Sequence, residues 1–375
     1  MIRLEPGPRR GTMRVPVSKS HAHRVLVAEF LAGRTAFLAP RADDCEDVLA
    51  TKRCLLALAA RSGVLDCGES GTTRRLLGPV AAAIGIAAEW KMEGRLASRP
   101  QIEYGASLAA GVHELPGDVS SQFASGLLFA LPLLEGDSEI AFSTPLKSRG
   151  YVDMTLAVLG DYGVEAEETP RGFRVRGGQR YVAPEGPPRI EGDWSSAAFI
   201  LAMAALGSEV GVSGGCAELR GDSLQPDRSA KDMLQALSAG GDMSLDVDER
   251  PDLFPVLSVV AAAGKGRVRF TGTRRLRLKE SDRVAAMGDV LGRFGARSFA
   301  GDGFFDVFGT GGSFRGGSFK SFSDHRVAMS VAVGATRAES PVEIDDATCA
   351  AKSFPTFFED FERLGTSGGI ERKAI

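Results

Sequence analysis

Several signatures that would assign this chain to a common class of protein are missing from its sequence. Only five residues are cysteine, none of them forms a C-x-x-C pair, and their odd number argues against a set of disulfides. Reduced thiols are typical of cytosolic proteins, so we expect a cytoplasmic location. The opening MIRLEPGPRRGTMRV has no apolar core like that of a secretory signal, and no run of about 18 uncharged apolar residues could cross a membrane.

The signatures of several common chemistries are missing too. The four histidines show no H-E-x-x-H and no paired Cys/His spacing, which argues against a catalytic metal. The sequence has no G-x-x-x-x-G-K-[ST] phosphate loop, no convincing dinucleotide fingerprint and no G-x-S-x-G elbow. The net charge of −3 lacks the basic excess of a nucleic-acid-binding protein. We therefore expect neither a nucleic acid nor a membrane as partner, and any anion site must come from local clustering.

What is present is one pattern that recurs six times. A polar or glycine-containing start leads into a helix rich in Ala, Val and Leu, and a β-branched strand follows. The strands are expected at Thr35–Ala39, Ala87–Met92, Glu139–Ser143, Glu209–Ser213, Arg267–Thr271 and Val342–Asp345. Three further amphipathic helices are expected at Asp47–Ala60, Tyr151–Leu159 and Ser281–Phe294. With 375 residues, 25% of them charged, the chain is long enough for two globular domains built from such βα units.

The starts of these helices are candidate anion sites, and residues 117–134, GDVSSQFASGLLFALPLL, show the pattern most clearly. Free N–H groups and the positive end of the dipole favour an anion at such a start. Cations also stand near several starts, where a positive charge opposes the dipole: Lys19, Arg24, Arg74, Arg75 and Arg326. An external anion would supply the missing negative charge. The alternative is that the caps are ordinary and each cation is a solvated surface residue.

Two acidic positions are candidates for moving protons. Residues 274–283, RRLRLKESDR, place Glu280 among Lys and Arg between an expected strand and a helix. This stretch fits either a capping segment with Ser281 as N-cap, or a phosphate-holding cluster beside a proton-transferring carboxylate. Asp252 follows Pro251 at another helix start. It could cap that helix, or it could accept a proton from a substrate hydroxyl.

Ten blocks of the sequence, taken in order, resemble the motif series of the enolpyruvylshikimate-phosphate synthase family of enolpyruvyl transferases. The blocks span almost the whole chain: SKSHAHR (18–24), CGESGTTRRLL (67–77), SRP (98–100), GDVSSQFASGLLFALPLL (117–134), SRGYVDMT (148–155), EGDWSSAAF (191–199), PD (251–252), RLKESDR (277–283), DHRVAM (324–329) and AAKSFPTFF (350–358). The resemblance implies transfer of an enolpyruvyl group from phosphoenolpyruvate to the 5-hydroxyl of shikimate-3-phosphate. This reaction releases phosphate through a tetrahedral ketal, in aromatic amino-acid biosynthesis, and needs neither a metal nor an organic cofactor.

The same resemblance implies an α/β fold with two domains, each an inside-out α/β barrel of three βαβαββ units. Residues 1–17 with 192–375 would form one domain, which carries the phosphoenolpyruvate side, and residues 18–191 an inserted domain that carries most shikimate-3-phosphate contacts. The active site would lie in the cleft between them, and we expect a monomer. The segment Arg99–Gly117 is shorter than is usual in the family, so one unit is expected to be incomplete.

Site residues follow from the resemblance, position by position. Phosphoenolpyruvate would be bound by Lys19, Gly71, Arg99, Gln122, Arg283, Arg326 and Lys352. Shikimate-3-phosphate would be bound by Lys19, Ser20, Arg24, Ser120, Ser121, Gln122, Ser148, Tyr151, Asp252 and Lys279. The catalytic residues would be Asp252, Glu280 and Lys19, with Asp252 taking the proton of the 5-hydroxyl and Glu280 helping to protonate the methylene carbon. Both substrates are polyanions, which suits this concentration of cations.

Two other readings stay open. The chain could be a diverged family member that acts on a related cyclohexene substrate, or a non-catalytic paralogue that only binds anions. The presence of both Asp252 and Glu280 argues against the inert paralogue. Three positions depart from the family pattern, namely Glu69, Arg275 and Pro226.

Overall fold

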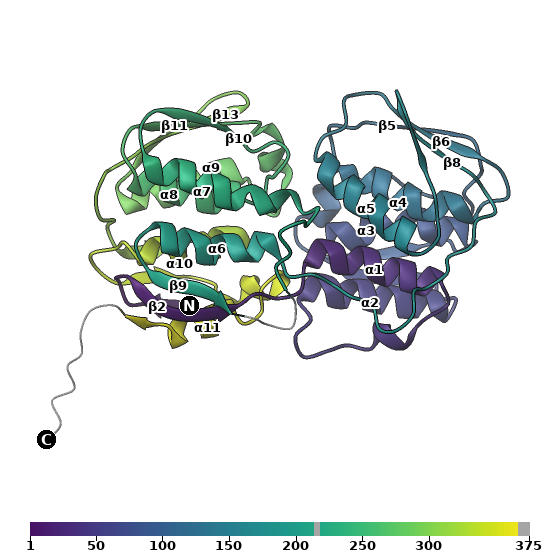
Figure 1. Ribbon diagram of the computed structural model, residues 1–375, viewed down its shortest axis with the longest axis horizontal. Coiled ribbons are helices and arrows are strands. Elements are labelled where there is room, and N and C mark those ends of the chain that lie inside the picture. The colour runs from purple at the N-terminus through teal and green to yellow at the C-terminus, as the bar shows by residue number, and fades with distance from the viewer. Residues whose placement is uncertain (214–217, 367–375) are drawn as a thin grey trace, which may run out of the picture. The chain divides into compact units, whose positions relative to one another are not determined.

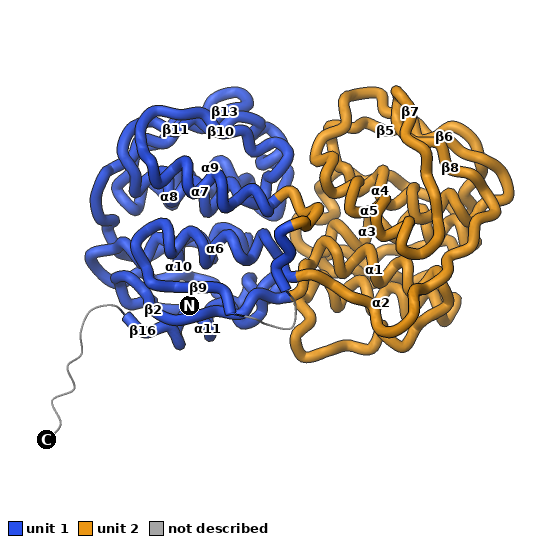
Figure 2. Tube along the Cα trace, viewed as in Figure 1, with its two compact units in different colours: residues 1–16, 192–221, 227–375 blue, residues 17–191, 222–226 orange. Residues whose placement is uncertain are grey.

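The structure, a computed structural model, describes residues 1–213 and 218–366. The chain divides into two compact units (Figure 2). Unit 1 comprises Met1–Pro16, Gly192–Gly221 and Asp227–Ile375, and unit 2 comprises Val17–Glu191 and Asp222–Pro226. Each unit has its own hydrophobic core of buried side chains, so each is considered by itself.

Unit 2 is built from five helices and two sheets. The helices are α1 (Lys19–Leu31), α2 (Glu46–Ala59), α3 (Gly71–Ala83), α4 (Ser121–Ala130) and α5 (Arg149–Asp161), with short 3₁₀ turns η1 (Ala36–Leu38), η2 (Leu96–Ser98) and η3 (Leu131–Leu133). One sheet pairs β3 (Val64–Gly68) with β4 (Glu89–Met92) in parallel. The other has the order β5-β6-β8-β7, from β5 (Val112–Leu115), β6 (Ser138–Phe142), β7 (Glu167–Thr169) and β8 (Gly172–Val175).

Unit 1 contains three sheets. Their orders are β1-β15-β14, β16-β2-β9 and β10-β11-β13-β12. The strands are β1 (Ile2–Leu4), β2 (Arg9–Arg14), β9 (Glu209–Ser213), β10 (Met243–Asp246), β11 (Arg267–Thr271), β12 (Arg297–Ala300), β13 (Phe304–Phe308), β14 (Gly317–Phe319), β15 (Val342–Ile344) and β16 (Gly365–Thr366). The helices are α6 (Trp194–Ala205), α7 (Ala230–Ala239), α8 (Phe254–Ala263), α9 (Arg283–Phe294), α10 (His325–Ala335) and α11 (Phe357–Arg363), with 3₁₀ turns η4 (Pro226–Ser229), η5 (Arg274–Leu278) and η6 (Thr348–Lys352).

Helices α6 to α10 of unit 1 lie between the sheet of β10, β11 and β13 and the sheet of β2 and β9 (Figure 1). Helix α8 packs on β11 and β13 on one side and on α6 and α10 on the other. All eleven residues of α10 are buried, as expected for a helix that is apolar nearly all round. The α/β class expected from the sequence is therefore confirmed.

Two stretches of the chain share one connectivity. The order β5-α4-β6-α5-β7-β8 in unit 2 matches β10-α8-β11-α9-β12-β13 in unit 1. In each, the first two strands are parallel and a hairpin completes the sheet with two antiparallel pairs. The β3-α3-β4 stretch has only its two parallel strands, because the chain runs from β4 to β5 with no further α-helix or strand.

One expected strand is wrong. Residues 35–39 form the 3₁₀ turn η1 instead, and only Leu38 of this stretch is fully buried. A single apolar anchor is satisfied by one helical turn, whereas a strand would need a neighbour for its backbone groups. In the part of the chain that the structure describes, no helix is long and apolar enough to cross a membrane.

Candidate active site

The first turns of the helices of unit 2 lie at one end of that unit. Gln122 at the start of α4 donates from Nε2 to the Thr72 Oγ1 at the start of α3, at 2.8 Å. Lys19, the first residue of α1, pairs with Asp47 in the first turn of α2, with 2.9 Å between Nζ and Oδ2. Arg24 of α1 reaches the Tyr151 carbonyl in the first turn of α5, at 2.8 Å. The dipoles of these helices therefore add at one place.

Serine side chains begin three of these helices. Ser18, Ser70 and Ser120 each accept a hydrogen bond from a backbone N–H of the first turn. A serine at this position satisfies one of the four N–H groups that a helix start leaves unpaired. The remaining N–H groups and the polar side chains beside them form a surface suited to anions.

Gly71 at the start of α3 lies directly against two arginines. A Cβ added to Gly71 would lie 3.2 Å from Arg75 Nη1 and 3.3 Å from Arg99 Nη1. The absence of a side chain therefore lets both guanidinium groups approach the N-terminal turn of the helix. Two cations over a helix start are well suited to a phosphate or a carboxylate.

Arg24 is held entirely within the protein. Its guanidinium donates to Thr155 Oγ1 at 2.8 Å, to the Ser20 carbonyl at 2.6 Å and to Ser125 Oγ at 3.4 Å, besides Tyr151. The side chain is 1% exposed, and burial lowers its pKa to about 10. These contacts tie α1, α4 and α5 together and fix the backbone of Ser20 and Tyr151.

Ser148 stands at the start of α5 in the left-handed conformation, with φ 56° and ψ 45°. This conformation is uncommon for a residue other than glycine, and it often marks a functional turn. Ser148 is buried, whereas Ser20, Ser120 and Tyr151 are partly exposed. Ser121 is buried as the first residue of α4.

In unit 1, Arg283 joins three carboxylates. Its guanidinium lies 2.7 Å from Asp252 Oδ1, 2.9 Å from Glu280 Oε2 and 2.9 Å from Asp324 Oδ2. Burial opposes the charge of Arg283, but these carboxylates outweigh it and raise its pKa well above the usual value. The first turns of α8, α9 and α10 thus meet at one place in unit 1.

Arg326 is a second arginine of this cluster, and not all of its N–H groups have a hydrogen-bond acceptor among the described residues. Its Nη2 lies 3.3 Å from Asp252 Oδ2. Its Nε and Nη1 atoms are buried and have no hydrogen-bond partner among the described residues. A buried guanidinium with unused donors is costly, because those donors have left water without gaining a protein acceptor. An anionic ligand would satisfy them.

Asp252 is held ionised by its neighbours. Burial alone would raise its pKa, but the charges of Arg326, Arg283 and Lys279 outweigh burial and lower the pKa well below its usual range. Asp227 shows the opposite effect, since burial and the charge of Asp252 raise its pKa to about 6. Asp227 accepts a hydrogen bond from Ser195 Oγ through one oxygen, and its other oxygen has no hydrogen-bond partner in the part of the chain that the structure describes.

The structure shows that neither Ser281 nor Asp252 caps the helix that follows it. The N-cap of α9 is Asp282, which accepts from the Ala285 N–H at 3.0 Å, while Ser281 donates its hydroxyl to Asp324 at 3.0 Å. Helix α8 begins after Leu253 without a side-chain cap, so Asp252 does not cap it. Its carboxylate pairs with the two arginines instead.

Lys279, Glu280 and Lys352 are the other predicted site residues of unit 1. Lys279 and Glu280 follow the turn η5, and Lys279 is close enough to lower the pKa of Asp252. Lys352 is buried at the end of η6, which packs on α10. The structure thus gathers Asp252, Lys279, Glu280, Arg283 and Arg326 around the starts of α8, α9 and α10.

Sequence reasoning gave no site role to several residues that hold these clusters. Asp47, Thr72 and Arg75 contact predicted site residues in unit 2. In unit 1, Asp324 pairs with Arg283, and Asp227 acts on Asp252 and Arg326 through its charge. Thr72, Arg75 and Asp324 stand inside recognised motifs, and the charge of Arg75 near a helix start also pointed to an anion contact. Among the described residues, no group of three or more His, Cys, Asp and Glu could hold a metal ion.

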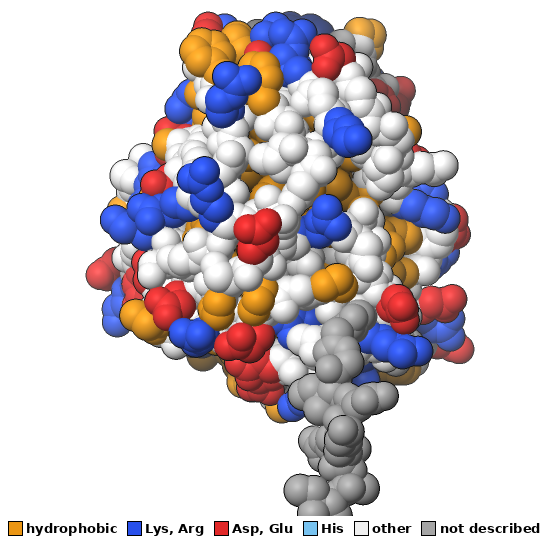
Figure 3. Space-filling view, turned by 90° about the vertical axis from the view of Figure 1, so that its left-hand side faces the viewer, with side chains coloured by type: hydrophobic (Ala, Val, Ile, Leu, Met, Phe, Trp, Pro, Cys, Tyr) orange, Lys and Arg blue, Asp and Glu red, His pale blue; other side chains and the backbone are white. Residues whose placement is uncertain are grey.

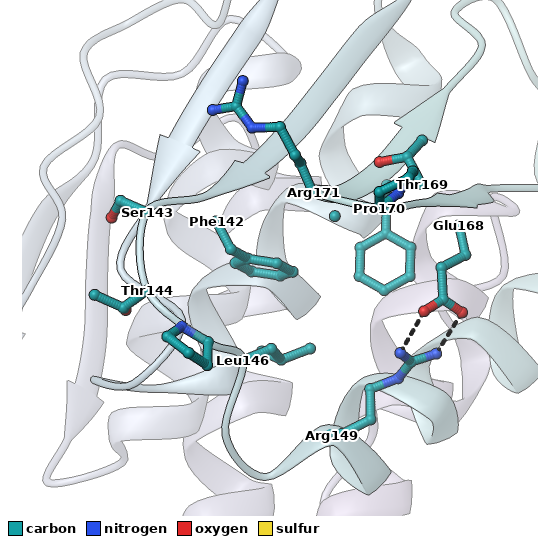
Figure 4. A pocket seen from close by; sticks show the side chains of 12 residues that line it. Phe142, Ser143, Thr144, Leu146, Arg149, Glu168, Thr169, Pro170 and Arg171 are labelled. Carbon is teal, nitrogen blue, oxygen red and sulfur yellow. Dashed lines mark hydrogen bonds and ion pairs between the residues drawn. The ribbon is translucent and has the colours of Figure 1, made fainter.

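A cavity of about 390 Å³ in unit 2 lies elsewhere (Figure 4). Its walls come from the loop after β6 and the turn between β7 and β8, and Arg149 pairs with Glu168 at its side. No predicted site residue lines it. On the surface drawn in Figure 3, side chains of both signs are interspersed.

Comparison with known proteins gives consistent similarities. A family model described as EPSP synthase (3-phosphoshikimate 1-carboxyvinyltransferase) matches residues 96–361. A 3-phosphoshikimate 1-carboxyvinyltransferase of Clostridium perfringens is 33% identical over 422 aligned positions, covering 96% of this chain and 97% of the relative. The enzyme of that name from Clostridium kluyveri is 34% identical over 421 positions, covering 97% of each.

Among solved structures, an EPSP synthase from Acinetobacter baumannii superimposes with a TM-score of 0.74 at 23% identity, covering 97% of this chain and 98% of that one. The alignments to the clostridial relatives are longer than the 375 residues of this chain. The relatives therefore contain positions that this chain lacks.

Proposed function

Because this chain belongs to the family of EPSP synthases (3-phosphoshikimate 1-carboxyvinyltransferases), we propose that the clusters described above bind and act on the two substrates of that reaction. The enzyme transfers the enolpyruvyl group of phosphoenolpyruvate to the 5-hydroxyl of shikimate-3-phosphate and releases phosphate, a step of aromatic amino-acid biosynthesis. The residue roles that follow are proposals about how this chain does so.

The observation that carries the assignment is Arg326, a buried guanidinium with two unused donors beside the Asp252 carboxylate. We assign those donors to an anionic group of phosphoenolpyruvate. Arg283 and Lys352 supply further positive charge from unit 1. Lys19, Arg99, Gln122 and the Gly71 backbone contribute from unit 2, where two guanidinium groups lie over the start of α3.

Shikimate-3-phosphate is proposed to bind at the starts of α1, α4 and α5, with Lys279 and Asp252 contributing from unit 1. Ser120 and Ser121 present hydroxyls and backbone N–H groups at the α4 start, which suits a phosphate. Ser20, Ser148 and Tyr151 would contact the rest of the molecule, with Gln122 and Lys19 between the substrates. Arg24, also a proposed ligand, fixes the backbone of Ser20 and Tyr151 through two of its hydrogen bonds.

In the reaction, Asp252 takes the proton of the 5-hydroxyl while Glu280, with Lys19, delivers a proton to the methylene carbon of phosphoenolpyruvate. The hydroxyl oxygen then bonds to the resulting cationic carbon and forms the tetrahedral ketal. Loss of a proton from the methyl group and departure of phosphate give the enol ether. Preformed cations around the site stabilise the charge that moves onto the leaving phosphate.

The arginines also control the strength of the base. In the free protein Arg326 and Arg283 keep the pKa of Asp252 low, which makes it a weak proton acceptor. When a phosphate or carboxylate binds those guanidinium groups, part of their positive charge is neutralised. The pKa of Asp252 then rises, so the carboxylate becomes a stronger base once the substrate is in place.

We further propose that each unit follows a pattern of three βαβαββ repeats with helices inside and sheets outside. The matched connectivity of the two four-stranded sheets supports this. The stretch β3-α3-β4 is then a repeat that has lost its second helix and its hairpin. The longer alignments of the relatives support such a loss. We propose that the enzyme acts as a monomer in the cytoplasm, without a metal or an organic cofactor.

The test is an assay of purified protein with phosphoenolpyruvate and shikimate-3-phosphate. We expect inorganic phosphate to appear only when both substrates are present. If both substrates bind and no phosphate appears, the anion-binding paralogue is favoured and the assignment is wrong. If shikimate-3-phosphate fails while a related cyclohexene alcohol supports phosphate release, the chain is a diverged member of the family.

A further inference from the structure

Arg75 of α3 is a buried cation near the start of its helix that has been given no role of its own above. Its side chain is 6% exposed, and its guanidinium lies over the ring of Phe123, 5.3 Å from the ring centre. Burying an arginine is costly unless its donors find acceptors. The acceptors that Arg75 has found therefore show what the residue does in this fold.

Arg75 donates to two segments that lie far apart in the sequence. Its Nη1 donates to the side-chain oxygen Oε1 of Gln122 at 2.9 Å, and its Nη2 donates to the Pro100 carbonyl at 3.1 Å. Gln122 stands in the first turn of α4, and Pro100 directly follows Arg99. One guanidinium thus fixes a proposed ligand on α4 and the backbone beside another proposed ligand.

The bond to Gln122 also sets which way its amide points. Because Oε1 accepts from Arg75 and Nε2 donates to Thr72 Oγ1, both ends of the amide have a partner. Without Arg75, the amide could turn over and present its oxygen where the nitrogen now lies. An amide nitrogen attracts an anionic substrate, whereas an amide oxygen repels it.

We propose that Arg75 is a positioning residue for phosphoenolpyruvate, which locks the amide of Gln122 and the Arg99–Pro100 backbone in their binding arrangement. This inference rests on the proposed function, since it takes Gln122 and Arg99 as ligands of that substrate. An arginine suits the role because its planar fork reaches two acceptors at once. A lysine has a single nitrogen and cannot span Gln122 and Pro100 in the same way.

The test compares Arg75→Lys with the unsubstituted enzyme in steady-state kinetics, with each substrate varied in turn. We expect the KM for phosphoenolpyruvate to rise by about tenfold or more and kcat to change by less than about threefold. The KM for shikimate-3-phosphate should rise less than that for phosphoenolpyruvate, because Gln122 contacts both substrates whereas Arg99 contacts only phosphoenolpyruvate. In a Gln122→Ala background, Arg75→Lys should have a much smaller effect, because the amide that it orients is gone.

A matched control is Arg34→Lys in the same unit. Arg34 likewise spans two acceptors with its fork, in this case the backbone carbonyls of Pro184 and Gly186, at 3.0 and 2.8 Å. It contacts none of the proposed ligands, so its substitution should leave both KM values unchanged. An equal rise in KM for the two arginine variants would show a general effect on the unit and would overturn the inference.

Three further outcomes also decide the question. An unchanged KM for phosphoenolpyruvate in Arg75→Lys contradicts the positioning role. So does a full effect of Arg75→Lys in the Gln122→Ala background. If neither Arg75→Lys nor Arg75→Gln binds shikimate-3-phosphate in a direct titration, the residue serves folding of the unit and not positioning. An inactive unsubstituted enzyme would count against the proposed function itself, which separates the two failures.

Discussion

Three cations act on the carboxylate of Asp252. It is partly exposed, yet Arg326 and Arg283 both bind it, and Lys279 adds a third positive charge. A carboxylate with a purely structural role would need only one cation as its partner. Because Arg326 also keeps buried donor atoms with no partner among the described residues, the cluster is suited to a further negative charge.

Replacing this carboxylate tests its proposed role as base. We expect Asp252→Ala to lower kcat by about 10²- to 10⁴-fold, the usual contribution of a general base, with a much smaller change in the dissociation constant of shikimate-3-phosphate. Steady-state kinetics and a binding titration measure the two quantities. Asp289→Ala is the control, because that exposed carboxylate pairs only with Arg293 on the same helix. Equal losses in turnover and binding would assign Asp252 to binding alone.

Asp227 should make stability depend on pH. Its pKa in the folded chain is about 6, compared with a usual value of 3.8, so the folded state holds the proton more tightly. This group leaves the free energy of unfolding unchanged below about pH 3.8. The free energy of unfolding falls as the pH rises from about 3.8 to about 6 and stays lower above pH 6. For a pKa shift of this size the reduction is about 3 kcal/mol.

Asp227→Asn removes this ionisation and keeps an oxygen for Ser195. Relative to the unsubstituted chain, we expect the free energy of unfolding of this variant to rise between pH 4 and pH 8. Urea denaturation at several pH values measures the difference. A difference that does not vary with pH would contradict a raised pKa at Asp227.

The apolar patterning and the capping residues predicted several helices and strands correctly. The strands β9 and β11 occupy the expected ranges, and Ser120 caps α4 at the start of the stretch 117–134. The errors arose where local signals compete. Ser281 and Asp282 are both good caps, and only the contact of Ser281 with Asp324, 43 residues away, decides between them.

Close packing of α3 on α4 gives a test at this scale. A Cβ at Gly126 of α4 would lie 2.3 Å from the Arg75 carbonyl oxygen and 2.9 Å from Pro79 Cγ, so Gly126→Ala must push the helices apart. We expect a loss of about 1–3 kcal/mol in unfolding free energy, although alanine is the better helix former. Thermal or urea denaturation measures it.

Gly160 is the matched control for that substitution. It lies near the end of α5, and a Cβ there would meet nothing within 4 Å. Gly160→Ala should therefore stabilise the chain by up to about 1 kcal/mol. If both alanine variants change stability in the same direction, the close approach of α3 and α4 does not set the requirement for glycine.

For the whole molecule, the ordered motifs were enough to indicate the α/β class, the family and its reaction. They could not show which residues hold the ligands in place. Arg75, Asp47 and Asp227 act through partners that are distant in the sequence, and such pairings appear only when the chain is folded. Arg24 is a similar case, because its contacts also tie helices together, and its role as a ligand of shikimate-3-phosphate stays a prediction.

Metal removal tests the chemistry of the whole enzyme. Its residues offer cations and carboxylates for the reaction, and the described part of the chain contains no cluster of three metal-ligating side chains. We expect extensive dialysis against EDTA to leave the initial rate within about twofold of the untreated value. A large loss that is restored by one divalent ion would contradict a mechanism carried by side chains alone.

The central claim is that this chain moves an enolpyruvyl group between two phosphorylated substrates. Phosphorus NMR of the purified protein with equimolar phosphoenolpyruvate and shikimate-3-phosphate tests it most directly. We predict that the phosphoenolpyruvate signal is replaced by inorganic phosphate while the ester phosphate of the shikimate moiety remains, and that neither substrate alone yields phosphate. Phosphate released from one substrate alone, or no release from the bound pair, would contradict the claim.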